Sequence, residues 1–209
     1  MRKSLVLSAA ALALALGAAQ AQDATMSFFI TSVGLGKGAN LGGLGGADAH
    51  CGMLAEAAGV TGKTWRAYLS SASVDAKDRI GAGPWHNAKG VKIADDVASL
   101  HSDANKIDKQ TGLTEKGTEV PGRGDTPNEH DILTGTNADG TKIADQTCGD
   151  WTLDGTEGAA MVGHHDRKGP DTLPTGTSWN AAHASRGGCS QEALIGTGGA
   201  GFFYCFAAN

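Results

Sequence analysis

Aromatic residues and recognisable repeats are both scarce in this sequence. Trp, Tyr and Phe together make up 5% of it, whereas glycine occupies 32 of the 209 positions. There is no repeat of fixed period, no Gln/Asn tract and no long run of charge, which argues against a disordered or low-complexity chain. Because the glycines are interspersed with apolar residues, the composition favours one domain with a modest sheet core and long ordered loops.

Positive charge is also in short supply. The whole chain carries 17 basic and 22 acidic residues, a net charge of −5, and no basic stripe runs along it. This balance excludes the electrostatic pattern typical of proteins that bind nucleic acid or anionic membranes. We therefore expect neither of these partners.

The sequence contains no apolar run long enough to span a bilayer, which needs roughly 20 residues. Its longest apolar run, residues 5–17, follows the basic pair Arg2–Lys3 and precedes the small-x-small pattern at residues 19–21. These features are typical of a cleaved signal peptide. They predict a leader at residues 1–21, a mature chain of residues 22–209, and export to the periplasm or the cell exterior with no membrane span.

The chain has only four cysteines, and none of them forms a CxxC pair. A structural zinc finger is therefore not expected. In an exported protein, four cysteines indicate two disulfides, although the spacing leaves all three pairings open.

The apolar pattern predicts several secondary structure elements. A helix at residues 47–58 places Ala47, Cys51, Leu54, Ala55 and Ala58 on one apolar stripe, with Asp48 in its first turn and Gly59 at its end. Strands are expected at residues 26–33, 64–70, 131–134, 159–163 and 201–206, and a short helix within 91–101. Residues 201–206 are apolar on both faces, which indicates a central strand paired near the first one.

Two blocks of sequence resemble the endostatin domain of collagens. The block GGADAHC at residues 45–51 is followed by GVTGKTWRAYLSS at residues 59–71, and weaker similarity follows in TGTNADG at 134–140 and CGDW at 148–151. The chain is also similar to bacterial exported proteins that are loosely called lectins. The resemblance implies an α+β, C-type-lectin-like fold with a twisted antiparallel sheet, flanking helices and long Gly-rich loops. It further implies that Cys51 pairs with Cys205 and Cys148 with Cys189.

Calcium-dependent sugar binding is one function that this resemblance raises. Asp125, Asn128 and Glu129 lie in the loop DTPNE at residues 125–129, and their oxygens are of the kind that calcium prefers. However, Thr126 stands where calcium lectins have a carboxylate ligand, and no Trp-Asn-Asp strand follows. We therefore expect no cofactor, with calcium at this loop as the alternative.

Loop tryptophans are the second group of candidate ligand-binding residues. Trp65 and Trp151 are expected in the core, whereas Trp85 and Trp179 lie in loops, where an indole face can stack on a sugar. Trp85, Trp179, Asp125 and Asn128 are thus the predicted ligand contacts.

No motif indicates catalysis. There is no G-x-S-x-G nucleophile, and the cysteines are expected in disulfides. His164, His165 and Asp166 are interpreted as a surface turn, since adjacent strand residues point to opposite faces and do not chelate one ion. An enzyme would require a Ser or Asp to cluster with His86, His130 or His183 in one cleft.

These observations predict an exported, non-catalytic recognition module that binds a glycan or extracellular polymer. The alternative is an envelope or matrix adhesion protein that binds another protein, and a hydrolase is the third possibility.

Overall fold

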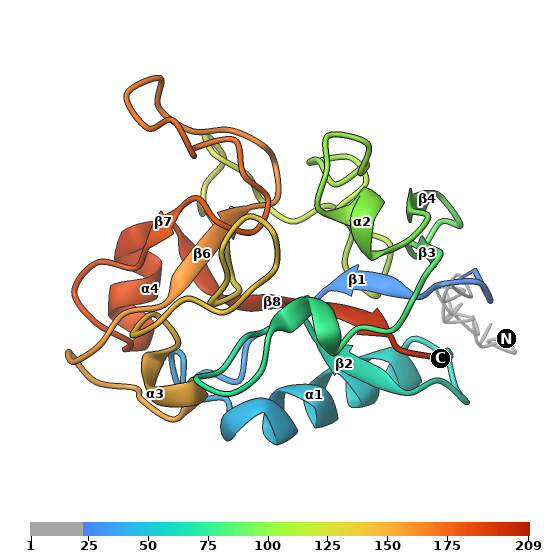
Figure 1. Cartoon of the computed structure of the whole chain (residues 1–209), viewed down its shortest axis with the longest axis horizontal. Coiled ribbons are helices and arrows are strands. Elements are labelled where there is room, and N and C mark those ends of the chain that lie inside the picture. Colours follow the sequence, from blue (N-terminus) through green and yellow to red (C-terminus); the bar gives the residue numbers. More distant parts are fainter. Residues whose placement is uncertain (1–22) are drawn as a thin grey trace, which may run out of the picture.

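The computed structural model describes residues 23–209 and has an α+β arrangement (Figure 1). The predicted signal peptide lies outside the described residues. The helices are α1 (Gly43–Ala57), α2 (Val97–Leu100), α3 (Cys148–Trp151) and α4 (Gln191–Thr197), with a 3-10 turn, η1, at Ala76–Asp78. The strands are β1 (Phe28–Ile30), β2 (Trp65–Ala67), β3 (Trp85–His86), β4 (Lys92–Ala94), β5 (Asp131–Leu133), β6 (Met161–His164), β7 (His183–Ala184) and β8 (Gly199–Ala207).

The last strand, β8, lies at the centre of the main sheet. The strand order is β1-β8-β5-β6-β7, with β2 also paired to β8, and β3 and β4 form a separate two-stranded sheet. The expected pairing of the first and last strands is confirmed, since Phe29 lies opposite Cys205. The sheet is not wholly antiparallel as predicted, because β5 runs parallel to β8. Figure 1 shows β8 crossing the middle of the molecule with β1 beside it.

Side chains on the two faces of this sheet build two separate cores, because successive strand residues point to opposite faces. Phe29, Phe203 and Cys205 face α1 and belong to one core. Phe28 and Tyr204 belong to the other, which the long loops cover. Within residues 23–209, no helix has the length and apolar character needed to cross a membrane.

Helix α1 packs its predicted apolar stripe against the sheet side that carries β2. The helix begins at Gly43, four residues earlier than expected, so Asp48 lies in the second turn and not in the first. The Asp48 carboxylate instead accepts a hydrogen bond from the Ala67 backbone N–H at 2.9 Å and pairs with Arg66 and Arg79. This acidic side chain therefore ties α1 to the segment around β2.

Two disulfides cross-link the domain. Cys51 of α1 bonds to Cys205 of β8, and Cys148 bonds to Cys189. This is the nested pairing that the endostatin resemblance implies. The first bond attaches the main helix to the central strand, across 154 residues of sequence.

Trp85 and Trp179 were both expected to lie exposed in loops, but Trp85 begins β3, and Trp179, in the loop between β6 and β7, is buried. Their exposed fractions are 1% and 3%, and both belong to the core on the loop-covered face of the sheet. The ring of Trp85 packs edge-on against Phe206, and Trp179 packs against Tyr68 at a centroid distance of 4.8 Å. In this structure neither indole offers a free face for stacking on a sugar, because the loops fold down over the sheet.

Candidate metal centre

Strands β5, β6 and β7 bring four potential metal ligands together at one edge of the sheet. Asp131 begins β5 and His164 ends β6, and these two residues are direct Cα partners. His183 begins β7 opposite Val162, which shares a face of β6 with His164. His130 immediately precedes Asp131. The four side chains therefore converge although they are far apart in sequence.

The donor atoms of these side chains surround one carboxylate oxygen. Asp131 Oδ1 lies 3.2 Å from His130 Nε2, 3.2 Å from His164 Nε2 and 3.7 Å from His183 Nε2. The Nε2 atoms of His164 and His183 are 3.0 Å apart. Asp131, His130 and His164 are buried, whereas His183 is partly exposed.

A second layer of acceptors orients the three imidazoles. The Nδ1 atom of His130 faces Asp166 Oδ1 at 3.2 Å, that of His164 faces the Gly176 carbonyl at 2.6 Å, and that of His183 faces the Ala184 carbonyl at 3.1 Å. A neutral imidazole has only one N–H, and these acceptors require it at Nδ1. All three Nε2 atoms then present lone pairs to the centre, which is the arrangement of metal-binding histidines.

The Asp131 carboxylate at the centre has no hydrogen-bond partner of acceptable geometry on either oxygen, although three imidazole nitrogens lie near it. In the tautomers that the outer acceptors require, the facing Nε2 atoms have no proton to donate to it. A buried charge without partners is costly. The cluster therefore presents acceptors to its centre, and a shared cation would satisfy them.

Electrostatic interactions act strongly on the groups around the centre. Burial opposes ionisation of Asp166, but hydrogen bonds from His130 and from the backbone N–H groups of Arg123 and Lys168 hold its pKa well below the usual range. Burial likewise lowers the pKa of His164, yet the nearby Asp131 carboxylate and the Gly176 carbonyl raise it overall. The field of the Asp131 carboxylate therefore favours a positive charge at this position.

The donor set indicates the class of metal. Three imidazole nitrogens and one carboxylate oxygen suit zinc and the neighbouring first-row transition metals better than calcium. With bonds of about 2.0–2.1 Å, tetrahedral zinc separates its ligand atoms by about 3.3 Å. Four of the donor separations, 3.0–3.7 Å, bracket that value, and the donor atoms of His130, Asp131 and His164 all lie within 4.8 Å of one another.

A cavity of about 510 Å³ opens onto the cluster. His130, His164 and His183 line it, together with Arg123, Asn128 and Arg186. The loop between β6 and β7, which Figure 1 shows rising from the body of the molecule, contributes Pro170 and Leu173. The centre is therefore accessible to a small ligand.

The residues predicted to bind calcium do not form this centre. Asp125 pairs with Lys109 and accepts a hydrogen bond from the Gly122 N–H at 2.8 Å. Asn128 lines the cavity, while Glu129 is half-buried and its pKa is raised by burial. Among the described residues, one group of three His, Cys, Asp or Glu side chains has donor atoms close enough to share an ion. It consists of His130, Asp131 and His164.

A turn follows β6 at residues 165–166 as predicted, but its predicted surface position is wrong, because the side chains of His164, His165 and Asp166 are all buried. The expectation that His164 and His165 point to opposite faces fits the structure. His164 enters the cluster, whereas His165 Nε2 lies 3.4 Å from the Pro121 carbonyl, and burial lowers the His165 pKa to about 4. Sequence reasoning missed the centre because only the pairing of β5, β6 and β7 unites its donors.

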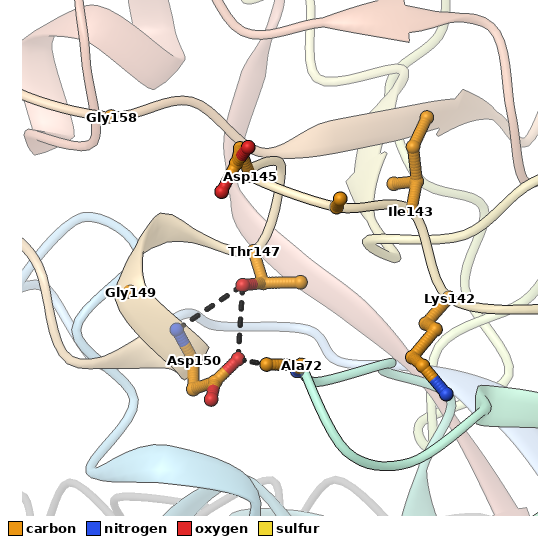
Figure 2. Close-up of a pocket in the computed structure, with 9 residues that line it drawn as sticks. Ala72, Lys142, Ile143, Asp145, Thr147, Gly149, Asp150 and Gly158 are labelled. Carbon is orange, nitrogen blue, oxygen red and sulfur yellow. Dashed lines mark hydrogen bonds between the residues drawn. The ribbon is translucent and has the colours of Figure 1, made fainter.

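A larger cavity of about 740 Å³ lies near α3, and Figure 2 shows its lining side chains. Asp150 Oδ1 accepts hydrogen bonds from the Ala72 N–H at 2.8 Å and the Thr147 hydroxyl at 3.1 Å. Lys142 lies 3.6 Å from Asp75. These polar groups hold neighbouring loops together, so this cavity is a weaker candidate than the histidine cluster.

Comparison with known proteins adds no assignment to this geometry. No protein-family model matches the chain, and no curated protein matches it. The chemistry of the centre therefore rests on its own residues.

Proposed function

We propose that this protein is an exported domain that binds a zinc-class metal ion through His130, Asp131, His164 and His183. The observation that carries the proposal is the buried Asp131 carboxylate, which faces three Nε2 atoms and has no hydrogen-bond donor on either oxygen. A single proton satisfies only one of these contacts, whereas a divalent cation would bind His130, Asp131 and His164, whose donor atoms lie within 4.8 Å of one another, with His183 Nε2 3.0 Å from His164 Nε2. The outer acceptors on each Nδ1 support the same assignment.

Analysis of the metal content of the purified protein tests the proposed zinc binding directly. The purified protein is stripped with a chelator, incubated with excess Zn²⁺, desalted and analysed by mass spectrometry of its metals. We expect one zinc per chain in the wild type and none in Asp131→Asn or His183→Ala. His86→Ala is the matched control, because His86 lies in the separate β3–β4 sheet. The proposal fails if the wild type retains no zinc, or if Asp131→Asn and His183→Ala retain as much as His86→Ala.

We further propose that the domain is C-type-lectin-like and acts outside the cytoplasm. The nested disulfides and the antiparallel pair of first and last strands support the fold, and the two disulfides support export to an oxidising compartment. N-terminal sequencing of the protein secreted by a bacterial host tests the export signal. A start at Gln22 supports it, and retention of residues 1–21 contradicts it.

The proposed role is recognition of an extracellular ligand, a glycan or another polymer, with a protein partner as the alternative. The buried positions of Trp85 and Trp179 remove aromatic stacking as the contact. The accessible cavity above the histidines supports binding there instead. A glycan array probed with zinc-loaded and zinc-stripped protein tests this role. Zinc-dependent binding supports it, and no signal above background on either form contradicts a glycan ligand.

Metal-assisted hydrolysis is a second candidate, favoured by one observation: the donor histidines line an open cavity. A zinc ion held by His130, Asp131 and His164, with its fourth position open to the cavity, would lower the pKa of a bound water to about 7, which supplies hydroxide at neutral pH. Hydrolysis of p-nitrophenyl acetate by the zinc-loaded wild type, absent in Asp131→Asn, would support this candidate. Equal rates in the two proteins would contradict it.

A further inference from the structure

We infer that the cavity above the metal centre binds an oxyanion, such as a phosphate, sulfate or carboxylate group, between Arg123 and Arg186. This inference rests on the metal site proposed above and assigns the chemical class of its ligand. Both arginines line the same cavity as His130, His164 and His183. A guanidinium group binds two oxygens of an oxyanion through paired hydrogen bonds, so two such groups beside a metal ion make a suitable anion site.

Arg123 is anchored to the centre through its backbone. Its N–H donates to Asp166 Oδ2 at 2.6 Å, and the other oxygen of Asp166 faces His130. The Arg123 side chain is exposed, and within residues 23–209 its guanidinium forms no ion pair. The donors of this side chain are thus available at the cavity.

Arg186 stands in the wall of the cavity. Its Nη2 donates to the carbonyls of Gly196 and Thr197 at 3.3 and 3.2 Å, near the end of α4. A guanidinium has five N–H donors, so others remain for a ligand. The carbonyl contacts restrict the position of this group before any ligand arrives, which reduces the entropy cost of binding.

The charges in and around the cavity favour an anion only when a metal is present. Asp131 and Asp166 balance Arg123 and Arg186, so these four side chains sum to zero. A divalent ion raises the total to about +2, within a protein whose overall charge is −5. Anion binding should therefore depend on the metal, and the anion should in turn raise the affinity for the metal.

Calorimetric titration of the zinc-loaded, desalted protein with inorganic phosphate tests the inference, with sulfate and acetate as parallel arms at constant ionic strength. We expect at least one of these anions to bind with one-to-one stoichiometry. We expect Arg123→Ala to weaken this binding about tenfold or more, since a charged hydrogen bond is lost. Its backbone contact to Asp166 is retained, so its zinc content should not change.

Lys89→Ala is the matched control, because it removes one exposed positive charge at the β3–β4 turn. Arg186→Ala provides a second variant, and circular dichroism verifies that each protein is folded. The inference is overturned if zinc binds but none of the three anions does, or if Arg123→Ala binds them as tightly as Lys89→Ala. Failure to bind zinc is a different result, which overturns the metal centre itself.

Discussion

Asp131 and His164 face each other as Cα partners of the β5–β6 ladder, with 3.2 Å between Asp131 Oδ1 and His164 Nε2. The contact lies at a buried position where neither carboxylate oxygen of Asp131 has a hydrogen bond of acceptable geometry. Burying a charge in this way destabilises a fold unless a partner compensates. The buried carboxylate is therefore costly to the metal-free protein, and a cation bound between Asp131 and His164 would remove this cost.

The first prediction follows from this cost. Asp131→Asn should raise the thermal midpoint of the chelator-treated protein, because a neutral amide replaces an unpartnered charge and can donate to an Nε2 atom. Zinc should stabilise the wild type, by about 4 kcal/mol at a thousand times the dissociation constant, and should leave Asp131→Asn unchanged. Thermal denaturation of both proteins, with and without zinc, measures this. A metal-free Asp131→Asn that melts well below the wild type would contradict the account.

The second prediction concerns the tryptophans. All four indoles are buried, with at most 5% of Trp65 exposed. Emission from the native protein should therefore be blue-shifted and resist quenching by acrylamide, whereas the denatured protein should be quenched efficiently. Phe replacements at Trp85 and Trp179 should each remove a protected fluorophore. Efficient quenching that disappears in Trp179→Phe would show an exposed indole and restore the stacking interpretation.

Much of the framework could be predicted from local sequence. The continuous apolar runs within residues 26–33 and 201–206 predict β1 and β8, because apolar residues on both faces require a covered, central position. The apolar spacing in residues 47–58 likewise predicts the buried face of α1. The earlier start of α1 at Gly43 was not predictable from propensity, since glycine disfavours helices. Gly46 is required there by a close approach, because a Cβ at this position would lie 2.0 Å from the Leu41 carbonyl oxygen.

The candidate centre could not be predicted in the same way. Its donors at positions 130–131, 164 and 183 have no ligand spacing, and the register of three short strands brings them together. The local composition around the tryptophans was equally misleading. Trp85 and Trp179 stand among Gly, Pro and Asn, yet Trp85 begins β3 and both indoles are buried. Whether such an indole faces the core or the solvent depends on tertiary packing, which local composition does not encode.

The third prediction concerns pH. Burial lowers the pKa of His101, although the hydrogen bond to the Val97 carbonyl partly opposes this. Tyr68 donates to the other ring nitrogen at 2.7 Å, which also favours the neutral ring. As the pH falls, His101 is protonated in the unfolded chain before it is protonated in the folded protein. The contribution of His101 to the stability of the fold is therefore complete above pH 6.5 and is lost as the pH falls below it. NMR titration of the His101 ring should give a midpoint below 6.5; a midpoint at or above that value would contradict the prediction.

The fourth prediction ranks the two disulfides. Removing Cys51–Cys205, which closes 154 residues, should cost about 5 kcal/mol, and removing Cys148–Cys189, which closes 41, about 4 kcal/mol on the chain-entropy model. Denaturant unfolding of the paired Cys→Ala variants measures both. In Cys205→Ser, alkylation followed by peptide mapping should find Cys51 labelled and Cys148 protected. Labelling of Cys148 would mean that the pairing is different.

The fifth prediction compares the replacement of glycine by alanine, which adds one methyl group, at two positions. At Gly163 of β6, a Cβ would lie 1.8 Å from the Trp179 carbonyl oxygen, and the atoms it meets belong to the backbone. At Gly52 of α1, no atom lies within 4 Å of the added Cβ. Gly163→Ala should therefore destabilise the protein by about 3 kcal/mol, because the chain must shift. Gly52→Ala should stabilise it by about 1 kcal/mol, because alanine is the better helix former.

Urea denaturation distinguishes the two effects, and zinc content gives an independent readout. Gly163 precedes His164, so a displaced backbone at this point should also weaken metal binding, whereas Gly52→Ala should leave it unchanged. A Gly163→Ala protein as stable as the wild type would mean that the strand and the Trp179 loop do not approach closely. Loss of stability with full zinc retention would mean that the loop moves and β6 does not. Loss of both stability and zinc would mean that β6 itself is displaced at Gly163, next to the buried imidazole of His164.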